Sequence, residues 1–161
     1  MINPVRDAVE ASPRHLDWST YKHTTDSDIF HETYWARVGR PPSATEISLF
    51  RQHFIGLLTE ASLIAAFAPT KGARQLLARL AGSVEHRVSL ATGAWCDSVR
   101  LKMASAGMCF DDHPGASADD AHDREFIMQL SRQRAAAQHG GPFVSTVYIG
   151  DGIWTPMPVA P

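Results

Sequence analysis

The residues with the clearest chemical potential lie near the end of the chain, where Gly150-Asp151-Gly152 follows the β-branched run of residues 144–149. A short run of this kind predicts a buried strand, and the acidic residue after it then lies at the carboxyl edge of the sheet. Open α/β sheets bind ligands and metals at that edge. The flanking glycines allow a substrate to approach closely. Asp151 is therefore a candidate ligand for Mg²⁺.

A second predicted strand, residues 86–91, ends in Thr92-Gly93. Because parallel strands share one carboxyl edge, we expect Thr92 and Asp151 to lie at the same edge of the sheet. The Thr92 hydroxyl and the backbone amides after it can bind phosphate oxygens, and Arg124 can neutralise their charge. Three simpler interpretations stay open: Thr92 as a helix cap, Arg124 as a surface charge, and Asp151 as a turn residue.

The order of these motifs resembles that of the haloacid dehalogenase-like (HAD) hydrolase superfamily, in its phosphoglycolate-phosphatase-like branch. Ser89-Leu90-Ala91-Thr92-Gly93 is similar to the second family motif, and Tyr148-Ile149-Gly150-Asp151-Gly152 is similar to the fourth. Arg124 stands where the family has its third-motif cation. The resemblance implies that Thr92, Gly93 and Arg124 bind the phosphoryl group of a small phosphorylated metabolite, and that Asp151 binds Mg²⁺.

The resemblance and the pattern of elements together predict an α/β fold, a partial Rossmann-like parallel sheet (a HAD-like core) with an N-terminal helical cap. Residues 1–68 have helical periodicity without a strand signal and are expected to form the cap-like domain. Residues 69–161 alternate helical and strand patterns and are expected to form the partial core. The strands at residues 86–91 and 144–149 should lie parallel.

Start and stop signals predict where the helices lie. Ser43, followed three residues later by Glu46, forms a capping box that predicts a helix start. Gly39 predicts the end of the preceding helix, over residues 26–38. Further helices are predicted over residues 73–80, 95–106 and 123–138.

The family's nucleophile has no counterpart in the expected place, at the end of an apolar N-terminal strand. The chain's single Asp-x-Asp, Asp26-Ser27-Asp28, follows polar residues, and Thr25-Asp26 is predicted to be the N-terminal cap of a helix. Aspartyl-phosphate chemistry needs one carboxylate in line with phosphorus and a second to move the leaving-group proton. We therefore expect a truncated relative, without the first motif and the C-terminal core, that is inactive as a phosphatase. The alternative is a non-catalytic remnant that binds phosphate or a partner.

Composition limits the other classes of function. The net charge is −2 and the basic residues form no stripe, which argues against a nucleic-acid partner. The eight histidines include no His-Glu-x-x-His or His-x-His pair, and the two cysteines form no Cys-x-x-Cys motif. No apolar run is long enough to cross a bilayer, and no leader is evident, so we expect a cytoplasmic protein without a membrane partner. The oligomeric state is left open.

Overall fold

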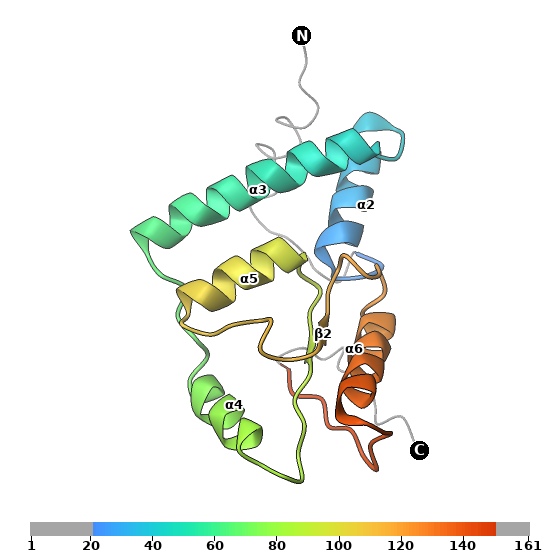
Figure 1. Ribbon diagram of the computed structural model, residues 1–161. Coiled ribbons are helices and arrows are strands. Elements are labelled where there is room, and N and C mark those ends of the chain that lie inside the picture. Colours follow the sequence, from blue (N-terminus) through green and yellow to red (C-terminus); the bar gives the residue numbers. More distant parts are fainter. Residues whose placement is uncertain (1–20, 151–161) are drawn as a thin grey trace.

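The structure, a computed structural model, describes residues 21–150 (Figure 1). This part of the chain is mostly helical, with one small sheet. The elements are α2 (Asp26–Val38), α3 (Ala44–Ile64), α4 (Ala73–Ala81), β1 (Leu90–Ala91), α5 (Cys96–Ser105), β2 (Gly115–Ala116) and α6 (Arg124–His139). In Figure 1, α5 runs below α3, and α6 stands beside the two strands.

The helix boundaries agree with the local signals in the sequence. Thr25 caps α2 by accepting a hydrogen bond from the backbone N–H of Asp28, and Gly39 ends this helix at a φ of 73°. A positive φ of this size strains residues with a Cβ, which is why glycine suits the position. The predicted capping box at α3 is confirmed, since Ser43 and Glu46 each accept the hydrogen bond that the motif requires.

The predicted α/β fold with a partial Rossmann-like sheet is wrong for the described residues. β1 pairs in parallel with β2, with Leu90 opposite Gly115 and Ala91 opposite Ala116, and the sheet has these two strands alone. Gly115 and Ala116, for which the sequence predicted no strand, form β2, whereas residues 144–149 form no strand. A β-branched run becomes a strand only where a neighbouring strand offers backbone partners, and no described segment lies in register with this one.

The largest cluster of buried apolar side chains joins the two halves of the chain. Phe30 and Tyr34 from α2 pack with Trp95, which precedes α5. Phe50 and Phe54 from α3 meet the indole of Trp95 edge-on, with ring centroids 5.9 and 5.8 Å away. Aromatic pairs favour this geometry. The predicted cap region and the start of the predicted core therefore share one cluster.

A polar network closes the turn between α2 and α3. The Glu46 carboxylate accepts hydrogen bonds from the Arg40 guanidinium at 2.8 and 2.9 Å, from the Ser43 backbone N–H at 2.8 Å, and from the Tyr34 hydroxyl. Hydrogen bonds from Arg40 and Tyr34 hold the pKa of Glu46 far below its ordinary range. The ionised form of this carboxylate is therefore favoured by folding.

We expect Glu46→Gln to lower the Tm at neutral pH, and we expect this loss to shrink as the solution is acidified. The unfolded chain protonates Glu46 near its ordinary pKa of about 4.3, whereas the folded chain protonates it only at lower pH. The stabilisation is thus present above that ordinary value and is lost as pH falls through the folded pKa. Thermal unfolding of both proteins across the acid range measures the difference. Glu60→Gln, on the exposed part of α3, is the control, and a Tm loss that grows on acidification would contradict the assignment.

Candidate functional site

Thr92 lies at the carboxyl end of β1, where its backbone N–H donates to the carbonyl of Ala116 at 3.0 Å. Its hydroxyl oxygen accepts a hydrogen bond from the backbone N–H of Ala94 at 3.1 Å. The hydroxyl therefore shapes the turn that leads from β1 into α5 and does not cap this helix, whose N-cap is Trp95.

Gly93 and Arg124, two of the three predicted phosphate-binding residues, are brought together although they are far apart in sequence. Arg124 is the first residue of α6, and its Nη2 donates to the carbonyl of Thr24 at 3.0 Å. A Cβ built on Gly93 would lie 2.7 Å from the same Nη2 and 2.9 Å from the Thr24 carbonyl oxygen. The Gly93 carbonyl accepts from the backbone N–H of Asp26 at 2.7 Å. The end of β1, the start of α2 and the start of α6 thus meet at Gly93.

The Asp26-Ser27-Asp28 motif forms the first turn of α2, and the side chain that caps this helix is that of Thr25, as predicted for Thr25-Asp26. The Asp26 carboxylate accepts from the backbone N–H of Trp95 at 2.9 Å and from the Ser98 hydroxyl at 3.4 Å. Burial raises the pKa of Asp26, and the Trp95 hydrogen bond opposes that shift. The Asp28 carboxylate accepts from the backbone N–H of His23 at 3.1 Å. The other oxygen of Asp28 lies 3.4 Å from Nδ1 of His122, so both carboxylates are engaged by groups of the protein.

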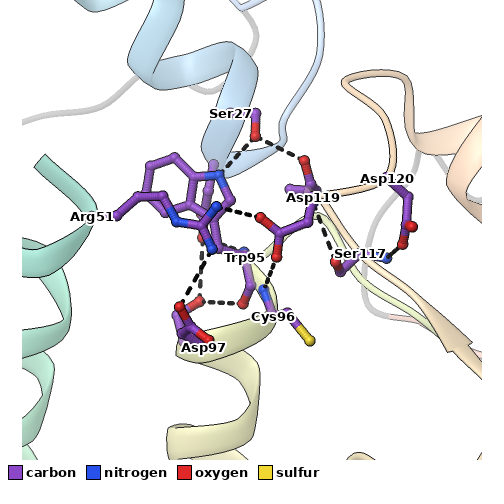
Figure 2. Close-up of polar contacts among 11 residues, drawn as sticks. Ser27, Arg51, Trp95, Cys96, Asp97, Ser117, Asp119 and Asp120 are labelled. Carbon is purple, nitrogen blue, oxygen red and sulfur yellow. Dashed lines mark hydrogen bonds and ion pairs between the residues drawn. The ribbon is translucent and has the colours of Figure 1, made fainter. Parts of the chain in front are cut away.

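A second carboxylate reaches the start of α5, and the sequence analysis did not single it out (Figure 2). Asp119 Oδ2 accepts from the backbone N–H of Cys96 at 2.8 Å, while Asp119 Oδ1 pairs with Arg51 of α3. The guanidinium of Arg51 also stacks 5.3 Å from the centroid of the Trp95 ring. Ser117 lies two residues before Asp119, and its hydroxyl accepts the backbone N–H of Asp119 at 3.2 Å. A serine in this position is a local sequence signal for a turn.

An open cavity of about 280 Å³ lies beside this cluster. Its two arginines are each paired with an aspartate of the lining, Arg100 with Asp111 and Arg134 with Asp120. Cys96 also lines it, and burial raises the pKa of this thiol, which disfavours a nucleophilic thiolate. The described residues around the cavity therefore present neither an unpaired cation for a phosphate nor an activated nucleophile.

The described residues do not fit a metal centre. Within residues 21–150, no three His, Cys, Asp or Glu side chains are arranged to hold an ion. Asp151, the predicted Mg²⁺ ligand, lies outside the described residues. Its expected place at the same sheet edge as Thr92 assumed a strand over residues 144–149, and these residues form no strand. None of the helices in the described range is long and apolar enough to span a membrane.

Comparison with known proteins returns no relative that would assign the site. No protein-family model matches the chain, and no curated protein or solved structure matches it either. The resemblance to haloacid dehalogenase-like hydrolases therefore rests on the motifs of this sequence alone.

We expect Gly93→Ala to destabilise the protein by about 1–3 kcal/mol, because the new methyl group must displace Arg124 and the rigid Thr24 carbonyl. Gly56→Ala is the matched control. Gly56 lies inside α3, and no atom lies within 4 Å of the place that its new methyl group would take, so the same change there should stabilise by about 0.5–1 kcal/mol. Denaturant unfolding of the three proteins measures both values, and equal stabilities for the two variants would refute the close approach at Gly93.

Proposed function

We propose that this chain is a non-catalytic phosphate-binding relative of the haloacid dehalogenase-like phosphatases. Its ligand would be a small phosphorylated metabolite, bound by Thr92, Gly93 and Arg124. The observation that carries the proposal is the meeting of Gly93 and Arg124 at the end of β1. A guanidinium at the end of a strand can place charge-assisted hydrogen bonds on a phosphate, which here would replace the bond from Arg124 to the Thr24 carbonyl. The proposal concerns these groups and does not depend on a Rossmann-like sheet.

The surrounding carboxylates support binding without turnover. Asp26 lies one hydrogen bond from Gly93, but its carboxylate is directed to Trp95 and Ser98 at the start of α5. Attack on phosphorus requires a carboxylate in line with the leaving group, and a buried carboxylate held by two donors does not offer that approach. A contribution from Mg²⁺ at Asp151 stays a prediction for the part of the chain outside residues 21–150.

The binding proposal is tested by titrating the full chain with phosphoglycolate and comparing it with glycolate, by calorimetry. Saturable binding of phosphoglycolate alone is expected. Arg124→Gln should weaken Kd at least tenfold, since a hydrogen bond to a charged group is worth about 1.5–3 kcal/mol. Arg132→Gln, on the same helix, removes an equal charge away from Gly93 and should leave Kd unchanged. Equal losses in both variants, or no binding by the wild type, would overturn the proposal.

The lack of turnover is tested separately. The purified chain should hydrolyse neither p-nitrophenyl phosphate nor phosphoglycolate above a blank when Mg²⁺ is supplied, because the Asp26 and Asp28 carboxylates are held by the backbone N–H groups of Trp95 and His23. Product release, measured as inorganic phosphate, checks this. Turnover that disappears in both Asp26→Asn and Asp28→Asn would instead make the Asp-x-Asp motif a nucleophile, and the non-catalytic assignment would be wrong.

A further inference from the structure

Residues 144–149 form an extended apolar segment on the surface of the molecule. The side chains of Val144, Val147 and Ile149 are 98%, 80% and 76% exposed. From Thr146 onward, burial alternates: Thr146 and Tyr148 are half-buried, whereas Val147 and Ile149 are exposed. An alternation of period two is the pattern of a strand with one face against the molecule and one face outward. The segment therefore has the form of a strand without belonging to a sheet.

The backbone of this segment also lacks partners within the described range. Residues 144–149 make no backbone hydrogen bond with another described residue. The hydroxyl oxygen of Thr146 is buried, and it too has no hydrogen-bond partner among residues 21–150. Exposed β-branched residues with a row of unpaired N–H and C=O groups form an edge that pairs readily with another strand.

The chemistry of the segment indicates what its partner is. Residues 143–150 contain no charged side chain, in a chain whose charged residues make up 20% of the sequence. Two copies of the segment can therefore approach each other without charge repulsion. A charged partner would find no opposite charge on the segment to bind. Identical strands that pair antiparallel across a two-fold axis satisfy each other's backbone groups along their whole length. Gly140 and Gly141, which follow α6, leave space around the approach to the segment.

We propose that residues 144–149 are a self-association surface, through which two copies of this chain form a symmetric dimer by antiparallel strand pairing. Val147 and Ile149 of one copy lie against the same face of the other copy, where β-branched cross-strand pairs shield each other from water. The surface involves neither Gly93 nor Arg124, so the proposal is independent of phosphate binding.

The test compares Val147→Lys with Val84→Lys, by sedimentation velocity of the full chain from micromolar to submillimolar concentration. Both valines are highly exposed, at 80% and 88%, but Val84 lies in the turn after α4. The wild type and Val84→Lys should form dimers as concentration rises. Val147→Lys should stay monomeric, because it places ammonium groups on both strands of the pair. Equal Tm values for the two variants exclude a folding defect.

Amide hydrogen exchange supplies the second readout. In the wild type, amides of residues 144–149 should exchange more slowly at high than at low protein concentration, and this protection should be absent in Val147→Lys. A wild type that is monomeric throughout the range would overturn the proposal. So would a dimer that survives Val147→Lys, or a dimer in which residues 144–149 exchange as fast as in the monomer.

Discussion

The rest of the structure depends on how the first turn of α5 is held. The Asp26 carboxylate accepts the backbone N–H of Trp95, while the Trp95 indole donates to the Ser27 hydroxyl at 2.7 Å. The Gly93 carbonyl accepts the N–H of Asp26 in return. These reciprocal bonds join the start of α2 to the exit of β1. They fix the Trp95 ring where Phe50 and Phe54 of α3 can pack against it.

This arrangement has a consequence for anion binding. A helix N-terminus attracts anions because its first N–H groups are unpaired and its dipole is positive there. At α5 these groups are already occupied by the protein's own carboxylates, from Asp26 at Trp95 and from Asp119 at Cys96. A phosphate would have to displace them, which would expose Arg51 and break the contact with α2.

The small size of the buried core leaves many apolar side chains on the surface of the molecule. Neither α3 nor α4 contains a fully buried residue, and Leu63 and Ile64 at the end of α3 are largely exposed. A chain that buries few apolar side chains gains little hydrophobic stabilisation, so further burial through association has more to add. Residues 144–149 differ from the exposed leucines of α3 because their backbone groups have no hydrogen-bond partner among the described residues. Association would therefore add backbone hydrogen bonds at residues 144–149, whereas at α3 it would bury side chains only.

Sequence alone determined the helices, because their ends depend on interactions within a few residues. Thr25, Gly39 and the Ser43–Glu46 capping box act on adjacent N–H and C=O groups, and the helices lie where these signals place them. The place of Asp26-Ser27-Asp28 in the first turn of α2 followed from the same local rule, whereas the bond between Asp26 and the distant Trp95 did not. Strand pairing, in contrast, depends on which distant segment lies alongside.

Only the tertiary structure decided that β1 pairs with the short Gly115–Ala116 strand rather than with residues 144–149. It also brought Gly93 against Arg124 and placed Asp119 on the start of α5. Those contacts join residues that are distant in sequence, and their geometry depends on how three helices pack around Trp95. No periodicity or motif in the sequence predicts that packing, because the local preferences of these residues are compatible with other tertiary arrangements as well.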